Sequence, residues 1–311
     1  MEEPLTNNNN VGLDNEMSLQ EFFNILLSGK WTIVSVTAFV SIIGVIYSLS
    51  LPNIYSSNAL LVPVNTSGSI ARSLNSYTTV ASLAGINLPS TANQPNSLKA
   101  VKKIDTLSFF ENNILPNIYL PDLMAAESWN SKTNTMVYDE SIFDTVTNSW
   151  VKSDSSVQKK MPSPQISYRA FKSKHLTITD DRKTGFVTIS IKHKSPFLAK
   201  QWAELVVNEI NSFYRQKDKL ESEKAVRYLN QQISKTALSE INEVLAKLLQ
   251  EEIKKLTLIE ANEYYVFDFI DPPAVMEKKI EPSRALICIL FSLMGGILSI
   301  LLVFYRHYKN N

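Results

Sequence analysis

Two long uncharged stretches lie near the two ends of the chain and organise everything between them. The first is Trp31–Leu51, "WTIVSVTAFVSIIGVIYSLSL", and the second follows Arg284 and ends at Phe304. The second holds twenty consecutive uncharged, mostly apolar residues. A helix rises about 1.5 Å per residue, so stretches of this length match a hydrocarbon core of about 30 Å. We therefore predict two transmembrane helices, at 31–51 and 284–304.

The first stretch is predicted to be an uncleaved anchor, although Ser48 and Ser50 would also form a passable signal-peptide cleavage site. The thirty residues up to Lys30 include five acidic residues and only one lysine. The apolar run is also longer than the ~7 to 15 residues of a signal-peptide core.

Charged residues beside the first stretch predict its orientation. Lys30 precedes it, and almost no lysine or arginine occurs in the twenty residues after Leu51. This asymmetry places the N-terminus in the cytoplasm. A second span returns the C-terminus to the same side, and the short tail 305–311 is expected to carry no output domain. Arg306 and Lys309 fit this orientation, whereas Lys278, Lys279 and Arg284 on the outer flank oppose it. Because the first helix usually dominates, we expect a bacterial inner-membrane protein with two spans, both termini cytoplasmic and 52–283 periplasmic.

The N-terminal segment 1–30 is predicted to be a cytoplasmic tail that ends in a short helix. Residues 1–16 are Asn-rich and acidic without apolar periodicity, which is typical of disorder. Ser18 and Glu21 then form a capping box. The apolar residues that follow fall on one helical face: Leu19, Phe22, Phe23, Leu26 and Leu27. This helix either lies on the inner membrane surface or simply continues into the first span.

The region 52–196 is predicted to be an α/β base domain. Tyr55–Val64 is a strand candidate, and Tyr77–Gly85 is a helix candidate made of small residues. Apolar residues at helical spacing predict a helix over Leu98–Leu115 that ends at Pro116. The polar span 117–164 is expected to hold short helices and loop.

From His175 onward, apolar residues no longer recur at helical spacing but at every second position. "HLTITD" and "FVTISIK", joined by Asp181 to Gly185, predict a β-hairpin with Leu176 and Ile178 beside Val187, Ile189 and Ile191. The strand-like "YYVFDFI" at Tyr264–Ile270 is expected to join the same sheet.

A long helical arm is predicted over 197–262. Neither proline nor glycine occurs between Pro196 and Pro272. Three pairs stand in the favourable i, i+4 order: Glu223 with Arg227, Glu243 with Lys247 and Glu251 with Lys255. One unbroken helix would be about 100 Å long. Since strands precede and follow it, a bend or helical hairpin is favoured, with its turn at Ser234–Ser239 and Thr236 and Ser239 as potential caps.

After the arm, 263–283 is predicted to be a return strand followed by an extended strap into the second span. Proline restricts the backbone to extended conformations. The strap residues of interest are Pro272, Pro273, Pro282 and Arg284.

Composition narrows the classes of function. The 311 residues have a formal net charge of +1, which argues against a polybasic nucleic-acid binder. The single cysteine, Cys288, lies inside the second span, so an intrachain disulfide is impossible and a thiol metal site is not expected.

Catalytic and cofactor motifs are absent from the sequence. It contains no GxxxxGK[ST] phosphate loop, no GxSxG and no HExxH. The three histidines, His175, His193 and His307, are expected to lie apart in polar settings. His193, between two lysines, is interpreted as a solvated strand end, with an acidic-sugar contact as the alternative. We expect no catalytic residue, metal or cofactor.

Small residues mark one face of each predicted span. Thr37, Ser41, Gly44 and Ser48 form a stripe in the first span, and Ser292 with Gly296 and Gly295 with Ser299 form small-xxx-small pairs in the second. The residues we select as packing candidates are Ser41, Gly44, Ser292, Gly295, Gly296 and Ser299. They either pack the two spans together or dock a membrane partner.

Several segments resemble a known family when taken together. They are "LPNIYSSNALLVPV", "SLAGINLP" at Ser82–Pro89, "DRKTGFVTISIKHKSP" leading to "AKQWAELVVNEIN", and "VFDFIDPPAVMEKKIEPSRALI". Over roughly 18–309 the chain resembles the chain length determinant proteins, or polysaccharide co-polymerases of the Wzz type, of Gram-negative envelopes. At Glu277–Lys279 the family often has a further proline that this chain lacks.

The resemblance implies an α+β fold: two transmembrane helices flanking a periplasmic α/β base domain with a long protruding helical arm. It also implies a homo-oligomer that is not an enzyme and that regulates O-antigen lipopolysaccharide chain length. The implied partners are the O-antigen polymerase and lipid-linked polysaccharide. The alternatives are a periplasmic adaptor of a polysaccharide export system and an envelope glycan hydrolase.

Overall fold

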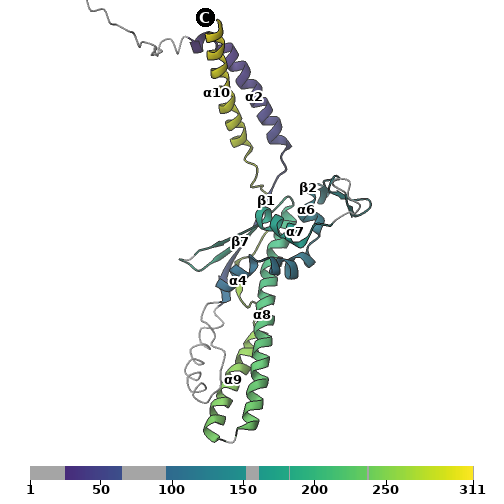
Figure 1. Ribbon diagram of the computed structural model, residues 1–311, viewed down its shortest axis with the longest axis vertical. Helices are drawn as coiled ribbons and strands as arrows, with labels where there is room; N and C mark the ends of the chain where they lie inside the picture. The colour runs from purple at the N-terminus through teal and green to yellow at the C-terminus, as the bar shows by residue number, and fades with distance from the viewer. Residues whose placement is uncertain (1–24, 65–95, 152–160, 182, 237, 311) are drawn as a thin grey trace, which may run out of the picture. The chain divides into compact units, whose positions relative to one another are not determined.

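A computed structural model describes residues 25–64, 96–151, 161–181, 183–236 and 238–310. The chain divides into two compact units, one made of residues 1–52 with 282–311 and the other of residues 53–281. The first unit contains apolar helices from both ends of the chain, and the second combines a four-stranded sheet with helices, two of them long (Figure 1). The predicted α+β fold class is confirmed.

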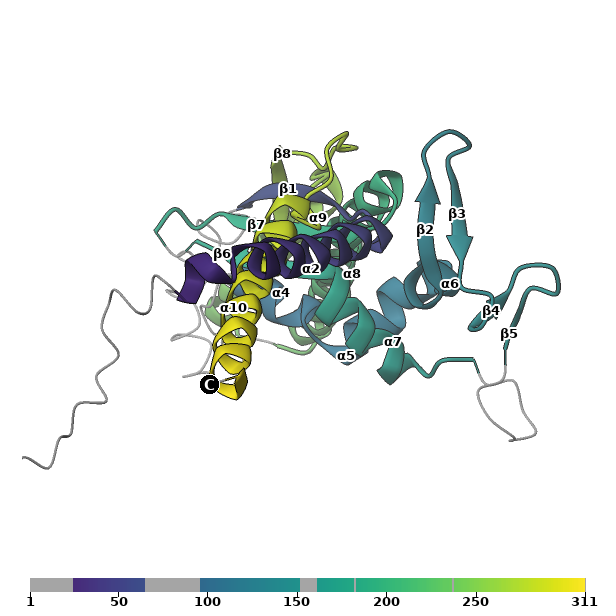
Figure 2. The ribbon, with the colours of Figure 1, turned by 90° about the horizontal axis from the view of Figure 1, so that it is seen from above.

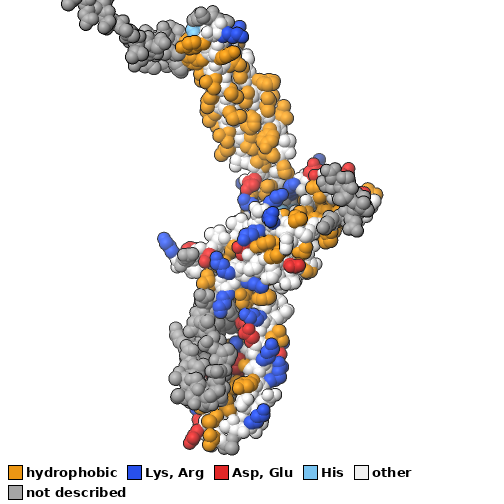
Figure 3. Space-filling model, in the orientation of Figure 1, with side chains coloured by type: hydrophobic (Ala, Val, Ile, Leu, Met, Phe, Trp, Pro, Cys, Tyr) orange, Lys and Arg blue, Asp and Glu red, His pale blue; other side chains and the backbone are white. Residues whose placement is uncertain are grey.

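The first unit is a pair of helices, α2 (Lys30–Ser50) and α10 (Arg284–Asn310), which pack against each other. Both are long and apolar enough to cross a membrane, and most of their large apolar side chains are exposed. Figure 3 shows apolar side chains covering the visible face of this pair. Helices that expose apolar residues on most sides are typical of a lipid environment rather than of contact with water.

The second unit is built on a four-stranded antiparallel sheet. Its strand order is β6 (Leu176–Asp180), β7 (Val187–His193), β1 (Tyr55–Pro63), β8 (Phe267–Asp271). The predicted hairpin is confirmed, with Leu176 opposite Ile191 and Ile178 opposite Ile189. The prediction that the last strand joins the same sheet is also confirmed, although β8 begins later than expected.

Alternate residues of β7 and β1 are buried, and α8 (Pro196–Lys235) packs on both strands. The α8 residues buried in the core recur at helical spacing and include Ala199, Trp202, Ala203, Val206, Val207 and Ile210. Small residues on this face let the helix lie close to the sheet. Ser195 begins the helix because its side chain accepts a hydrogen bond from the Leu198 amide.

The arm is a helical hairpin of α8 and α9 (Ser239–Ala261). The predicted turn is confirmed, because α8 ends at Lys235 and α9 begins at Ser239. A separate small core of Leu229, Leu245 and Leu248 holds the far part of the hairpin together. Figure 1 shows this part extending beyond the sheet of the same unit.

Of the two predicted caps at this turn, Thr236 is confirmed and Ser239 is wrong. Thr236 is the C-cap of α8, and its hydroxyl donates to the Gln232 carbonyl. The N-cap of α9 is Leu238, which has no side-chain hydrogen bond, and Ser239 is the first helical residue.

A charged segment of α8 contacts the end of α9 instead of only facing solvent. Lys219 pairs with Glu260, and Asp218 accepts a 2.6 Å hydrogen bond from the Tyr265 hydroxyl. Polar contacts therefore replace apolar ones where the hairpin rejoins the sheet.

The predicted continuous helix over Leu98–Leu115 is wrong. The chain forms α4 (Asn96–Ile104), α5 (Leu107–Phe109), a π-helix η1 (Phe110–Ile114) and a 3₁₀ turn η2 (Leu115–Asn117). Thr106 causes the break, since its hydroxyl donates to Lys103 O and accepts from Phe109 N. Pro116 lies within η2 rather than after a helix end.

The span 117–164, expected to hold only short helices and loop, contains two small hairpins. After α6 (Leu120–Met124) come β2 (Ala126–Asn130) with β3 (Thr135–Tyr138), and β4 (Phe143–Asp144) with β5 (Ser149–Trp150). Asn134 and Asn148 adopt φ values of 52° and 50° in the two turns. The helix α7 (Pro164–Ala170) and the π-helix η3 (Phe171–His175) then lead into β6. Seen from above, both hairpins lie away from the four-stranded sheet (Figure 2).

Some expectations lie outside the described residues. They are the tail 1–16 with the Ser18–Glu21 capping box, the small-residue helix at Tyr77–Gly85, and the "SLAGINLP" segment at Ser82–Pro89.

One buried side chain joins α8 to β8. The Asn211 amide donates to the Phe267 carbonyl at 2.9 Å, and its oxygen accepts from the amides of Val266 and Phe267 at 2.8 and 2.9 Å. Asn211 is 5% exposed, so water cannot replace these bonds. Three backbone groups of the return strand thus depend on one side chain of the helix.

We predict that Asn211→Ala destabilises the second unit by roughly 3 kcal/mol or more, because three buried backbone groups lose their partner. Asn211→Asp should be less harmful, because it keeps an acceptor for both amides. Denaturant unfolding of the full chain in detergent, followed by circular dichroism, measures the change. Asn230→Ala, at an exposed α8 position, is the matched control and should change stability by less than about 0.5 kcal/mol. Equal stability of the Asn211 and Asn230 variants would contradict the prediction.

Candidate functional site

The small residues selected in the two apolar helices lie largely at the α2–α10 contact. A Cβ built on Gly44 would lie 2.6 Å from Phe291 Cβ, and one built on Gly295 would lie 2.9 Å from Val40 Cβ and 3.2 Å from Thr37 Cα. A gap this narrow leaves no room for a larger side chain, and such contacts bring helix backbones close together.

Hydroxyl groups add polar contacts to the same face. Ser41 and Ser292 share a hydrogen bond of 2.8 Å between their hydroxyl oxygens, and Thr37 and Ser299 approach to 3.5 Å. Ser299 is fully buried and also donates to the Gly296 carbonyl at 2.7 Å. In an apolar surrounding such hydrogen bonds help to set which faces of the two helices meet.

Gly296 differs from the other five selected residues. A Cβ built there would meet no atom within 4 Å. The close approach of α10 to α2 therefore depends on Gly295, whereas Gly296 faces open space.

Of the strap residues, Pro272 and Pro273 lie in the second unit, and Pro282 and Arg284 lie in the first. Pro273 is buried and Pro272 is exposed at the end of β8. Near the other end of the strap, Ile54 pairs with Glu281 in an isolated β-bridge, and Lys192 binds the Glu281 carboxylate at 2.7 Å. Pro282 directly follows this bridge, and Arg284 is the first residue of α10.

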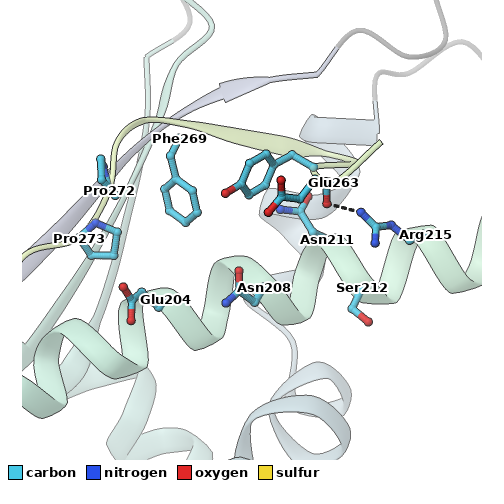
Figure 4. Close-up of a pocket in the computed structure, with 10 residues that line it drawn as sticks. Glu204, Asn208, Asn211, Ser212, Arg215, Glu263, Phe269, Pro272 and Pro273 are labelled. Atoms are coloured by element: carbon cyan, nitrogen blue, oxygen red, sulfur yellow. Dashed lines mark hydrogen bonds between the residues drawn. The ribbon is translucent and has the colours of Figure 1, made fainter. Parts of the chain in front are cut away.

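A cleft of 490 Å³ opens between α8 and the β8 strand with its strap. Its α8 side contributes Glu204, Asn208, Asn211, Ser212 and Arg215, and its other side contributes Glu263, Tyr264, Phe269, Pro272 and Pro273. Figure 4 shows Phe269 extending from the strand toward the helix, with Glu204 and Asn208 extending toward it. Tyr264 and Phe269 form an edge-to-face pair with ring centroids 5.7 Å apart.

The polar groups of the cleft differ in their availability. Asn211 is used by the return strand, and the Arg215 guanidinium donates to the backbone carbonyls of Asn262 and Glu263. Asn208 is exposed, and within the described part of the chain its side chain has no hydrogen bond. Glu204 keeps only a contact of 3.3 Å with Lys200 on the same helix. Sequence reasoning missed this cleft, because its two walls are about sixty residues apart.

The histidine expectations were wrong for two of the three residues. His175 and His193 stack with ring centroids 5.4 Å apart, and both contact the Trp202 ring edge to face. His193 is 2% exposed, so it is neither a solvated strand end nor a surface contact for an acidic sugar. Its place in the alternating pattern of β7, two residues after buried Ile191, is the signal that could have predicted its burial.

Burial lowers the pKa of both imidazoles, to about 4 for His175 and about 3 for His193. Neighbouring positive charge adds to this effect. Lys174 and Lys194 lower the pKa of His175, and His175 and Lys194 lower that of His193. His193 Nδ1 accepts from the Ser195 amide and Nε2 donates to the Asp122 carbonyl at 3.1 Å, so the neutral ring is fully bonded. The Asp122 carboxylate accepts a hydrogen bond of 2.6 Å from the Tyr138 hydroxyl, and burial raises the pKa of Asp122. This is a structural cluster that holds α6, β7 and α8 together.

Among the described residues there is no group of three or more His, Cys, Asp or Glu side chains that would hold a metal ion.

Comparison with known proteins gives one match to a family. The model of the family "Wzz: Chain length determinant protein" matches residues 15–104. This match confirms the family resemblance over those residues, which are part of the longer stretch in which the resemblance was stated from the sequence. No curated protein matches the chain significantly.

Solved structures of polysaccharide co-polymerases are also found. The chain is 14% identical to a "full-length bacterial polysaccharide co-polymerase", with a TM-score of 0.43, over 94% of this chain and 99% of that one. It is 12% identical to a fragment of WzzB, a polysaccharide co-polymerase from Salmonella Typhimurium, with a TM-score of 0.30, over 74% of this chain and 100% of that one.

We predict that Gly295→Leu separates α2 from α10, whereas Gly296→Leu does not, because only the first position lacks space for a side chain. Overpacking of this kind costs about 1 to 3 kcal/mol. The measurement is the yield of a disulfide between Ser41→Cys and Ser292→Cys in a Cys288→Ser background, in detergent or lipid. Gly295→Leu should lower the yield roughly fivefold or more, and equal yields for the two leucine variants would refute the assignment.

We predict that the second unit loses stability as pH falls from about 6.5 toward 4, because the unfolded chain then binds protons that the buried histidines do not. Each lowered pKa contributes stability that is complete above the unfolded value and is lost on acidification. The slope approaches ~1.4 kcal/mol per pH unit for each histidine. Asp122, whose pKa is raised by burial, contributes with the opposite sign.

His193→Gln should remove about half of this slope between pH 6.5 and 5. Denaturation midpoints of the full chain at several pH values measure the slope, which is independent of any uniform loss of stability. Asn230→Ala, at an exposed α8 position without a titratable side chain, is the control and should leave the slope unchanged. An unaltered slope in His193→Gln would rule out the histidine pair as its origin.

Proposed function

We propose that this chain, which carries a chain length determinant region at residues 15–104, regulates how long a polysaccharide of the O-antigen type grows. It would act without catalysis, as an oligomeric scaffold in the inner membrane beside the polymerase that joins the repeat units. The family match is the observation that carries this proposal.

The proposed topology has both termini in the cytoplasm and two spans, 31–51 and 284–304. The base domain 52–196, the arm 197–262 and the strand with its strap 263–283 would lie in the periplasm. Two apolar helices near the chain ends, α2 and α10, support an inner-membrane protein. Charges beside the first span support the orientation.

The acids of the arm fit a binding or scaffolding surface better than a hydrolase. Glu243 lies 2.7 Å from Lys247, and Glu223 lies 3.9 Å from Arg227. Such i, i+4 pairs are typical of solvated helix faces, whereas glycosidase carboxylates face each other across a substrate. Lys255 pairs with Glu252 rather than with Glu251, at 3.9 Å.

In this proposal, the polysaccharide chain length depends on the number of weak contacts that an oligomer offers to a growing chain or to its polymerase. Linked weak sites raise the effective affinity without any strong single site. Longer retention of the chain at the polymerase would then give a longer product.

We predict that deletion of the gene for this chain replaces a clustered distribution of polysaccharide lengths with a broad one, and that the intact gene restores the cluster. Gel electrophoresis of the lipopolysaccharide measures the distribution. An unchanged modal length would contradict the proposal. Unchanged lengths with less polysaccharide at the cell surface would instead favour an export adaptor.

A further inference from the structure

We propose that the cleft between α8 and the β8 strand with its strap binds a short neutral segment of a polysaccharide. This inference rests on the proposed function, because it assigns part of that role to one site. The cleft volume of 490 Å³ falls within the ~300 to 1,000 Å³ of small-molecule sites.

One wall of the cleft offers hydrogen-bonding groups in a row. Glu204, Asn208 and Ser212 follow one another at intervals of four residues on α8 and line the cleft together. Such residues lie about 6 Å apart along one helix face. The row supplies a carboxylate acceptor from Glu204 and an amide that donates and accepts from Asn208. The Ser212 hydroxyl already accepts a hydrogen bond of 3.3 Å from Gln216. Sugar hydroxyls need this mixture of donors and acceptors at spacings of about one ring.

The opposite wall is apolar and rigid. Tyr264 and Phe269 brace each other edge to face at 5.7 Å, and Pro272 and Pro273 continue the surface along the strap. Figure 4 shows Phe269 facing Glu204 and Asn208 across the opening. Sugar rings carry C–H groups on one face and hydroxyls around their edge, so an aromatic wall opposite a polar wall suits them. A lipid chain would leave the polar row unpaired, which disfavours it.

The charges of the cleft favour neutral sugars over acidic ones. Glu204 and Glu263 are the carboxylates of its lining, and Arg215 is the one cation among its lining residues. Nη2 of Arg215 donates to the carbonyls of both Asn262 and Glu263, which leaves this guanidinium partly engaged. An anionic ligand would therefore meet two carboxylates and one partly engaged cation, a less favourable balance of charge than a neutral sugar meets.

The test is photo-crosslinking in cells that make the polysaccharide. Full-length chain carries the photoreactive residue p-benzoylphenylalanine in place of Asn208, an exposed position where a larger side chain fits. The matched control carries it at Asn230, also exposed on α8 but away from the cleft. After irradiation and purification, a glycan stain detects captured polysaccharide, and sugar analysis of the adduct gives its composition.

The expected result is a glycan adduct at position 208 that is about tenfold stronger than at position 230, equivalent to ~1.4 kcal/mol of local preference. Glu204→Trp, at a position that faces the opening in Figure 4, should reduce capture at position 208 by a similar factor while leaving chain folding and membrane insertion unchanged. Equal capture at both positions, or none at 208, would overturn the inference. So would an adduct made of uronic acids.

A covalent dimer of this chain at position 208 would also overturn it and would assign the cleft to contacts between copies. Failure here is distinguishable from failure of the proposed function, because gene deletion reports on chain length whether or not the cleft captures glycan. A shifted ladder without capture refutes the cleft alone.

Discussion

The architecture of the second unit depends on the hydrogen bonds of Asn211. This side chain leaves the middle of α8, is buried, and completes three backbone groups at the start of β8. A chain that leaves a sheet from β7 through two long helices has no local reason to return to that sheet beside β1. Asn211 provides one, because the return strand satisfies its buried amides and carbonyl only when it lies against that turn of the helix.

This contact also explains how the arm and the cleft coexist. Beyond Asn211 the helices are held by paired charges, by the Tyr265–Asp218 hydrogen bond and then by a small leucine core. On its side facing the strap, α8 leaves the cleft open beside Glu204 and Asn208. The same helix thus has three surroundings: one face covers the sheet, another face lines the cleft over an overlapping stretch, and the remainder forms half of the arm hairpin.

The first unit follows different physics. In lipid the hydrophobic effect does not drive helices together, so their pairing depends on close packing and on hydroxyl hydrogen bonds. Gly44 against Phe291 and Gly295 against Val40 supply the packing, and Ser41 with Ser292 supplies the hydrogen bond. Under the proposed function, the remaining apolar surface of the pair faces lipid or the polymerase, while the second unit handles the glycan.

Local patterns in the sequence were enough to predict the two apolar helices, the β6–β7 hairpin, the strand Tyr55–Pro63 and the turn of the arm. Each of these depends on neighbours in sequence: uncharged length, alternation over a few residues, or the need for a chain to reverse. The family resemblance and the small-residue faces were visible for the same reason.

Tertiary structure decided the burial of His193 against Asp122 and the cleft of Asn208 and Phe269, because both bring together residues far apart in the chain. The break at Thr106 and the hairpins within 117–164 rest on local hydrogen bonds that the pattern of apolar positions does not contain. Whether a polar side chain such as Asn211 or His193 faces water or a backbone amide is determined by what packs over it, and a linear pattern of hydrophobic and polar positions does not contain that partner.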